Sequence, residues 1–168
     1  MKIKKLIYLL SWRTFGKLFF KCSPYLLFRY RVLILKIFGA KVSWSSRIYP
    51  TANIYSPANL TVGKNACISY KTIIYNVNNI IIGNNSCISQ YSFLCTASHD
   101  YEDIDMRIKS SPITIGKNVW IGADVYIGMG CEIGDKSIVA ARSVIFNNVG
   151  ANEIVSSTSK HYIIKKRI

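Results

Sequence analysis

His99 is the residue best suited to acid–base chemistry, and it is one of two histidines in the 168-residue chain. A neutral imidazole can take a proton from a hydroxyl group near pH 7, and a general base of this kind is typically worth about 10²–10⁴ in rate. Asp100 follows directly and could orient the ring, whereas Glu102, Asp103 and Asp105 are more simply explained as a solvated loop face. His99 and Asp100 are therefore candidate catalytic residues, with a merely solvated histidine as the alternative.

The cysteines do not indicate disulfide or zinc chemistry. They are odd in number and no two stand in a Cys-x-x-Cys pair, so neither a disulfide framework nor a zinc site is expected. Cys131 occupies a small position of the repeat described next, which indicates a core thiol in a reducing compartment. The five cysteines are Cys22, Cys67, Cys87, Cys95 and Cys131.

A six-residue repeat must position these groups. Between Ile115 and Ile145 an aliphatic residue returns at every sixth position, usually followed by Gly, and the fifth position is small or β-branched. A period of six fits neither an α-helix nor a simple strand and is typical of a parallel β-helix. The aliphatic side chains would point to the axis and stack between coils, and the Gly would supply positive φ at the turn. We predict an all-β solenoid.

The same repeat begins less regularly at Ile48, with two slips of two residues that bulged corners would produce. Grouped in threes, the hexads give about five coils. The rhythm breaks once, between Leu94 and Ile115, where polar residues and the first acids of the chain cluster. A solenoid that interrupts its stacking usually does so for function, so we expect an extruded functional loop at about residues 95–114.

The first 42 residues differ in composition and predict helices. From Tyr25 to about Gly39, apolar residues recur at spacings of three and four with basic residues between them, which indicates an amphipathic helix. Residues 3–21 predict a less regular helix. Such a segment can cap the open end of the solenoid or rest on anionic lipid, and the two interpretations are compatible.

The domain organisation follows from these boundaries. We assign residues 1–42 to the helical segment, 43–150 to the β-helix and 151–168 to a basic tail that folds back as a short strand or helix. No signal peptide and no apolar run of 18 residues is present. We expect a cytoplasmic protein, with peripheral contact at the inner membrane surface as an extension of the lipid interpretation.

The charge is strongly asymmetric. The chain carries 22 Lys and Arg against 8 Asp and Glu, and no acid precedes Asp100, whereas residues 1–99 hold 13 basic residues. Such a field favours an anionic partner, such as a membrane surface or a phosphorylated cofactor, although an ordinary basic surface is the alternative. Aromatic residues do not alternate with Arg as in nucleic-acid-binding segments, so no nucleic acid is expected.

Several segments carry a resemblance to a known family. The hexads resemble the left-handed β-helix acyltransferases. Residues 23–41, 88–100 and 123–143 resemble the colanic-acid-biosynthesis acetyltransferases, which belong with the maltose, galactoside and nodulation sugar O-acetyltransferases. The string Cys95-Thr-Ala-Ser-His-Asp100 is the most specific part. The resemblance implies a left-handed β-helix and a homotrimer, with active sites in clefts between neighbouring solenoids.

The resemblance also implies a mechanism and a coenzyme site. His99 would deprotonate a sugar hydroxyl for direct attack on the thioester of acetyl-CoA, so Cys95 need not be a nucleophile. Trp120 would flank the thioester, and Arg142 could hold phosphates. Main-chain groups of the same later coils would bind the pantetheine amides, at Gly122, Ala123, Ala141 and Ser143. The chain departs from the family at Ser156-Ser-Thr-Ser159, where a Gly-Asn-Pro-Ala-type turn is common.

The resemblance favours a sugar O-acetyltransferase that uses acetyl-CoA and acts on a surface polysaccharide or its lipid-linked precursor. N-acetylation of an amino sugar is an alternative that the sequence does not separate. A non-catalytic trimeric scaffold would leave His99 and the loop unexplained. A metal-dependent β-helix carbonic anhydrase needs three histidine ligands, whereas this chain has only His99 and His161, so we expect no metal.

Overall fold

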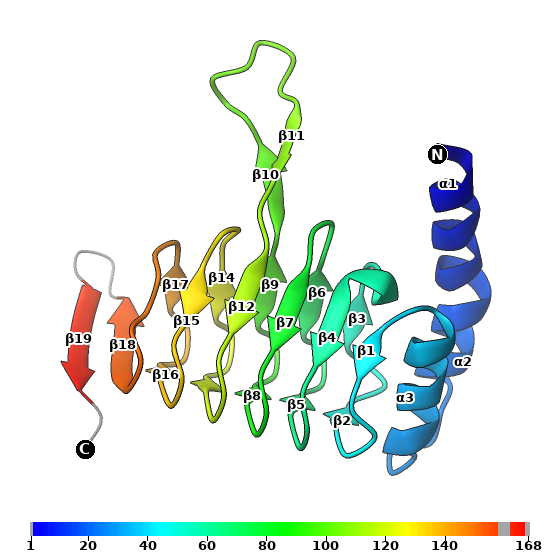
Figure 1. Cartoon of the computed structure of the whole chain (residues 1–168), viewed down its shortest axis with the longest axis horizontal. Helices are drawn as coiled ribbons and strands as arrows, with labels where there is room; N and C mark the ends of the chain where they lie inside the picture. Colours follow the sequence, from blue (N-terminus) through cyan, green and yellow to red (C-terminus); the bar gives the residue numbers. More distant parts are fainter. Residues whose placement is uncertain (1, 158–161, 167–168) are drawn as a thin grey trace.

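Short parallel strands wind into a triangular solenoid with helices at one end and a projecting arm (Figure 1). The computed structural model describes residues 2–157 and 162–166. Sheet A contains β1 (Lys41–Val42), β4 (Leu60–Val62), β7 (Ile80–Ile82), β12 (Ile113–Ile115) and β15 (Glu132–Ile133). Sheet B contains β2 (Arg47–Ile48), β5 (Cys67–Ile68), β8 (Cys87–Ile88), β13 (Trp120–Ile121), β16 (Ile138–Val139), β18 (Glu153–Ser157) and β19 (Tyr162–Lys166). Sheet C contains β3 (Asn53–Ile54), β6 (Ile73–Tyr75), β9 (Phe93–Cys95), β14 (Tyr126–Ile127) and β17 (Val144–Ile145).

Each coil contributes one strand to each sheet, which confirms the predicted left-handed parallel β-helix. Sheets A and C have five strands each, and β18 begins a further coil on sheet B. Val62 pairs with both Val42 and Ile82, so the first coils advance by 20 residues, whereas Ile133 pairs with Ile115 after 18. The two additional residues lie in the corner between sheets C and A, as the slips in the repeat predicted.

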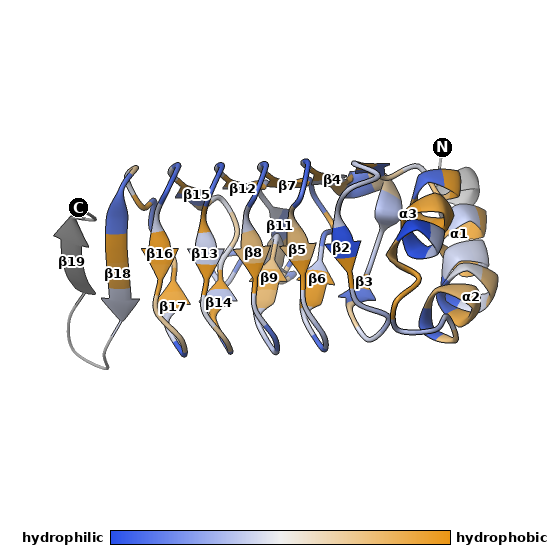
Figure 2. Cartoon of the chain, turned by 90° about the horizontal axis from the view of Figure 1, so that it is seen from below, coloured by the Kyte–Doolittle hydropathy of each residue, from blue (hydrophilic) through white to orange (hydrophobic). Residues whose placement is uncertain are grey.

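The core is a stack of aliphatic side chains along the solenoid axis. Ile68, Ile88 and Ile121 pair in register on sheet B, and each is fully buried. In Figure 2, β5, β8 and β16 of sheet B and β6, β9 and β17 of sheet C appear hydrophobic. Burial of one such side chain contributes roughly 1.5–3 kcal/mol. Because every coil covers the next, the stack forms a continuous core.

The predicted role of the repeat glycines is wrong. Neither Gly116 nor Gly122 has positive φ; the left-handed residue instead comes two positions later, as in Asn118 (φ 56°) and Asp124 (φ 57°). The glycine is needed for close approach between coils, because a Cβ on Gly122 would lie 2.6 Å from the Ala141 nitrogen. The sequence signal was correct, but its cause is packing rather than backbone freedom.

The N-terminal helices cap the first coil, as predicted. Trp12 is buried, and its indole Nε1 donates a hydrogen bond to the Ile54 carbonyl oxygen at 3.0 Å. Its ring also packs against those of Phe20 and Phe38. No helix in residues 2–157 or 162–166 is long and apolar enough to cross a membrane. The helical elements are α1 (Lys2–Ser11), η1 (Trp12–Gly16), α2 (Lys17–Lys21) and α3 (Phe28–Ile37), and a single turn, η2 (Pro57–Asn59), lies in the first coil.

The amphipathic helix starts three residues later than predicted, at Phe28 instead of Tyr25. The cause is Arg31, whose buried guanidinium donates hydrogen bonds to the carbonyl oxygens of Pro24 (2.8 Å) and Tyr25 (2.7 Å). These bonds hold the preceding residues in a turn outside the helix. Arg31 also donates to the Ile48 carbonyl oxygen and so attaches α3 to the first coil.

Two antiparallel hairpins depart from the solenoid. The predicted loop forms an arm whose strands are β10 (Ala97–His99) and β11 (Ile108–Ser110). In the tail, β18 pairs with β19, which confirms a short strand that folds back. Residues 158–161 and 167–168, including His161 and part of the Ser156–Ser159 stretch, lie outside the described residues.

Candidate active site

His99 lies at the base of the arm, and the fold fixes its protonation pattern. Its Nδ1 atom is 2.5 Å from the Met106 carbonyl oxygen, and the side chain is exposed. A carbonyl oxygen can only accept a hydrogen bond, so Nδ1 carries the proton and donates it. In the neutral ring Nε2 then keeps its lone pair and can accept a proton from a substrate hydroxyl.

The structure does not place the Asp100 carboxylate against the His99 ring. Asp100 instead lies 3.4 Å from the Lys109 ammonium and accepts a hydrogen bond from the Glu102 nitrogen. Both contacts stabilise the base of the arm. The ring is oriented by a main-chain carbonyl, which a prediction based on side-chain types could not identify.

The tip of the arm is folded by a second carboxylate. Asp103 forms an ion pair with Arg107, and the hydrogen bond from this guanidinium lowers the pKa of the Asp103 carboxyl. The Asp103 carbonyl oxygen accepts a hydrogen bond from the Met106 nitrogen at 2.8 Å. Asp103 therefore fixes the turn that carries the Met106 carbonyl to His99. It was expected to be only solvated, and this indirect role is a finding of the structure.

A cavity of about 290 Å³ opens beside His99. Cys95 is buried in its wall, where the thiol donates to the Ala97 carbonyl oxygen at 3.1 Å. Burial, together with a hydrogen bond to Cys95, raises the pKa of Tyr126 to about 12. Cys95 is thus a wall residue, as its position in the hexad suggested. The cavity is lined by Tyr75, Cys95, Ala97, Ser98, His99, Ile108 and Tyr126.

A second cavity of about 280 Å³ brings together four of the six predicted coenzyme-binding residues: Trp120, Gly122, Ala123 and Ala141. Trp120 is 53 % exposed, and its indole Nε1 donates to the Ser89 hydroxyl at 3.0 Å. This hydrogen bond sets the orientation of the ring at the mouth of the cavity. The other lining residues are Ser89, Gln90, Ile138, Val139 and Ala140.

The remaining two predicted residues do not line this cavity. Ser143 is fully buried, and its hydroxyl accepts a hydrogen bond from the Ser157 nitrogen. Arg142 is exposed at the same corner, 3.9 Å from the Asp124 carboxylate. The Gly122 nitrogen donates to the Val139 carbonyl oxygen inside the solenoid, so this N–H is already committed. Gly122 therefore contributes space rather than a hydrogen bond.

Sequence reasoning missed Ser89 and Gln90 in this cavity. Their signal is the register of the repeat, because Ile88 pairs with Ile121 and the two residues after each strand must stack at the same corner. Ala140 and Ala141 follow by the same rule from the pairing of Ile121 with Val139. Residues two and three of successive hexads thus form one corner surface.

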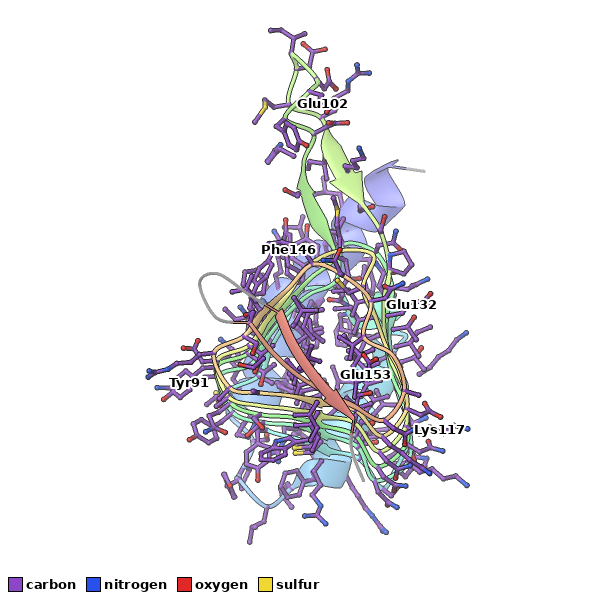
Figure 3. All side chains as sticks on the ribbon, turned by 90° about the vertical axis from the view of Figure 1, so that its left-hand side faces the viewer. Tyr91, Glu102, Lys117, Glu132, Phe146 and Glu153 are labelled. Atoms are coloured by element: carbon purple, nitrogen blue, oxygen red, sulfur yellow. The ribbon has the colours of Figure 1, made fainter. Side chains whose placement is uncertain are left out.

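The two cavities lie at different corners of the triangle. In Figure 3 the arm with Glu102 rises above one corner, Tyr91 marks the second and Lys117 the third. The His99 cavity is at the arm, between sheets C and A, and the Trp120 cavity is at the Tyr91 corner, between sheets B and C. Within one copy of the chain, the proposed base and the proposed coenzyme site are therefore separated by the width of sheet C.

In the described residues no cluster of three or more His, Cys, Asp or Glu side chains could hold a metal ion.

Comparison with known proteins identifies the family. Residues 112–147 match the family described as bacterial transferase hexapeptide (six repeats). WcaF of Escherichia coli, provisionally described as a colanic acid biosynthesis acetyltransferase, is 36 % identical over 157 residues, which cover 94 % of this chain and 86 % of WcaF.

Solved structures agree with this assignment. A hexapeptide-repeat acetyltransferase of Vibrio cholerae superposes with a TM-score of 0.84 at 27 % identity, covering 97 % of this chain and 92 % of the other. A galactoside acetyltransferase in complex with coenzyme A gives a TM-score of 0.85 at 25 % identity, covering 96 % and 80 %. The chain therefore belongs to the hexapeptide-repeat acetyltransferases, and it is an acyltransferase.

Proposed function

We propose that this protein transfers an acetyl group from acetyl-CoA to a sugar hydroxyl, with His99 as the general base. The observation that carries the proposal is the hydrogen bond from His99 Nδ1 to the Met106 carbonyl oxygen, because it leaves Nε2 available as a base. The residue and its tautomer fit proton abstraction from a neutral hydroxyl near pH 7.

The reaction needs one base that later acts as an acid. His99 Nε2 takes the proton as the hydroxyl oxygen attacks the thioester carbonyl carbon. When the carbon–sulfur bond breaks, the imidazolium returns this proton to the departing thiolate of coenzyme A. No acyl-enzyme is needed, which agrees with the position of Cys95 in the cavity wall.

Acetyl-CoA as the donor is supported by related structures. The Vibrio cholerae acetyltransferase has been solved with acetyl coenzyme A, and the galactoside acetyltransferase with coenzyme A. In this chain we assign the pantetheine arm to the cavity of Trp120, Ala123 and Ala141. Arg142 is exposed one residue beyond the cavity and is placed to meet the coenzyme phosphates.

A trimer would join the two half-sites. Sheet C lies between the arm corner and the Tyr91 corner, so packing sheet C around a threefold axis brings His99 of one copy to Trp120 of the next. The outer surface of sheet C suits such an interface because it carries a row of aromatic rings in edge-to-face or tilted contact. The row consists of Tyr55, Tyr75, Phe93, Tyr126 and Phe146.

The acceptor class is supported by the relatives. WcaF is provisionally linked to colanic acid, which is a polysaccharide, and the galactoside enzyme acts on a sugar derivative by name. We infer that the acceptor is a surface polysaccharide unit or its lipid-linked precursor. The proposal therefore predicts faster acetyl transfer to sugar hydroxyl groups than to amino sugars.

The experiment is calorimetry with acetyl-CoA, followed by an acetyl-transfer assay against matched hydroxyl and amino sugars. We expect saturable binding and coenzyme A release that depends on a hydroxyl sugar. Transfer only to amino sugars would replace the proposed reaction with N-acetylation. Absence of acetyl-CoA binding would contradict the proposed donor and favour a non-catalytic scaffold.

A further inference from the structure

We propose that the outer face of the N-terminal cap, formed by α1, η1, α2 and α3, binds the surface of an anionic lipid bilayer. The cap covers the first coil with one side and presents its other side away from the solenoid (Figure 1). The proposal rests on the apolar and charged residues of this outer face and does not require the proposed reaction.

The first helical stretch, formed by α1, η1 and α2, has a buried face and an exposed face. Trp12, Gly16 and Phe20 are buried against the first coil, and this inner face holds the cap in place. The opposite face is apolar, and none of the residues that the structure describes covers it; α2 and α3 appear partly hydrophobic at the end of the solenoid in Figure 2. The exposed large apolar residues here are Leu6, Ile7, Leu10, Phe15, Leu18 and Phe19.

The helix α3 adds another row of exposed apolar side chains. Leu26, Tyr30, Leu33 and Ile37 are exposed at spacings of four, three and four, which place them along one side of α3 and the turn before it. Leu26 is 78 % exposed and Ile37 is 71 % exposed. A monomeric soluble surface rarely keeps contiguous apolar patches of this kind without a partner.

The charge of the cap selects the kind of partner. Residues 1–42 contain ten Lys and Arg and no Asp or Glu. Some of these cations are structural: Arg13 stacks on Tyr55, and Lys17 donates to Asn53. Lys21 and Arg29 are exposed beside the apolar residues. An apolar face flanked by cations is the pattern of an interfacial helix on anionic lipid.

A cavity of about 400 Å³ at the edge of the cap has the same mixed character. Arg29 and Arg47 contribute guanidinium groups to its lining, whereas Leu26, Leu27 and Trp44 contribute apolar surface. Guanidinium groups bind phosphate oxygens through paired N–H donors, and the apolar side chains suit the adjoining acyl region. This combination fits a phosphate-bearing lipid headgroup.

A second copy of the chain is a less suitable occupant. Two caps placed face to face would bring Lys21 and Arg29 of one copy close to cations of the other, and such like-charge contacts are costly. An anionic bilayer satisfies the apolar stripes and the cations together. The bilayer is therefore the partner that the chemistry of this face favours.

The position of the cap also relates to the acceptor, and this step rests on the proposed function. His99 follows β9 of the third coil, and neighbouring coils are about 4.8 Å apart, so the base lies roughly 10 Å along the axis from the first coil. The helices of the cap add about 10 Å, so a sugar anchored to a lipid would reach His99 if it extends roughly 20 Å from the bilayer surface. The cap would present the solenoid end-on to a membrane-bound substrate.

The test is flotation of the full-length protein with vesicles of phosphatidylcholine alone and with vesicles that also contain phosphatidylglycerol. We expect binding to the anionic vesicles that weakens with added salt. The variant L10S/L18S/L33S should lose at least about tenfold in vesicle affinity, because it removes apolar surface that the bilayer would bury. The variant K21Q/R29Q should lose a similar factor at low salt.

Matched controls are available far from the cap. Y101S/I104S removes exposed apolar side chains from the arm, and K117Q/K136Q removes exposed cations from the later coils of the solenoid. Both controls should bind vesicles as the wild type does, and thermal melts should match for all four variants. Failure of the wild type to float, or equal binding by L10S/L18S/L33S, would overturn the proposal.

Two further outcomes separate the alternatives. A lower molar mass of L10S/L18S/L33S in light scattering would show that another copy covers the cap, which would also overturn the proposal. Transfer to a soluble sugar is measured in parallel and should be unchanged in the cap variants. A wild type that floats but does not transfer would contradict the proposed reaction and leave membrane binding intact.

Discussion

At the scale of single residues, the proposed catalysis depends on the position of one proton on the His99 ring. Met106 offers His99 an acceptor that belongs to the main chain, so no side chain competes for the proton on Nδ1. The arm holds this carbonyl through Asp103, which pairs with Arg107 and accepts from the Met106 nitrogen. Substitutions in the arm tip should therefore act through the orientation of His99.

The first prediction concerns the base itself. His99→Ala should lower turnover at least about 100-fold, because a general base typically contributes this much. The exposed side chain has few packing contacts, so the thermal melt should remain near that of the wild type. Acetyl transfer and the melt are measured together.

Ser98→Ala is the matched control, because Ser98 is the exposed neighbour that lines the same cavity. It should retain most of the wild-type turnover. Equal turnover of His99→Ala and the wild type would remove His99 from the mechanism.

A second prediction concerns a pair of thiols on sheet B. Cys67 and Cys87 pair in register on neighbouring coils. A hydrogen bond from Cys67 is the main reason that the pKa of Cys87 is lowered to about 7, whereas the same bond raises the pKa of Cys67. Alkylation of Cys87 should therefore be half-maximal near pH 7, below the ordinary thiol value of 9.0.

Peptide mass spectrometry over a pH series checks this result. Cys67→Ala removes the donor that stabilises the thiolate, so the midpoint for Cys87 should move to higher pH. Cys22→Ser removes the exposed thiol at the cap as a background control. An unchanged midpoint in Cys67→Ala would show that the hydrogen bond has no influence.

The residue scale also shows what a sequence can and cannot predict. His99 could be found because histidine is rare in this chain and stands where the repeat breaks. The role of Met106 could not be found, because any residue supplies a carbonyl and only the folded arm brings this one to the ring. The burial of Ser143 could also be predicted, because the fifth position of each hexad must be small to fit inside near a corner.

At the scale of elements, one buried cation joins the cap to the solenoid. Arg31 donates hydrogen bonds to Ile48, Ser23, Pro24 and Tyr25, and burial lowers its pKa. Its partners are carbonyl and hydroxyl oxygens, so removal of the guanidinium would leave several buried acceptors without a donor. Such groups are expensive to leave unpaired.

Arg31→Ala should therefore lower the free energy of unfolding by about 2–4 kcal/mol, measured by urea denaturation. Arg29→Ala is the matched control, since it removes the same side chain from an exposed position of the same helix. The control should change the free energy by less than about 0.5 kcal/mol. Similar losses in both variants would contradict the role assigned to Arg31.

The elements were predictable to different degrees. The coils followed from the hexads, because inward aliphatic residues and small corner residues are required in every coil. The start of α3 did not, because Ser23-Pro24 is an ordinary helix-start signal, whereas in the fold Arg31 and main-chain hydrogen bonds hold the next residues in a turn. The left-handed corner residues, such as Asn118 and Arg142, were missed because the glycine pattern was explained by backbone freedom rather than close packing.

At the scale of the whole molecule, the proposed trimer interface is the outer surface of sheet C. We expect Ile73→Asp to break a trimer, because Ile73 is an exposed residue of β6 on that surface and a buried carboxylate is costly. Light scattering should show a lower molar mass. Ile81→Asp on β7 of sheet A is the matched control, with similar exposure, and should keep the wild-type mass.

A trimer mass that survives Ile73→Asp but not Ile81→Asp would place the interface on sheet A instead.

The sequence predicted the residues of both proposed half-sites but could not show that they lie at different corners of one chain. His99 and Trp120 are only 21 positions apart in sequence. Only the register of the coils shows that they lie at different corners.

The most direct test of the shared site is a mixing experiment. His99→Ala lacks the base, and Ala141→Phe fills the cavity beside Trp120, so each variant alone should be inactive. Mixed trimers place an intact His99 against an intact cavity at about a quarter of their interfaces if the subunits assemble at random. We therefore predict that co-expression restores about a quarter of wild-type turnover. Activity no higher than that of the two variants measured separately would contradict a site built from two copies.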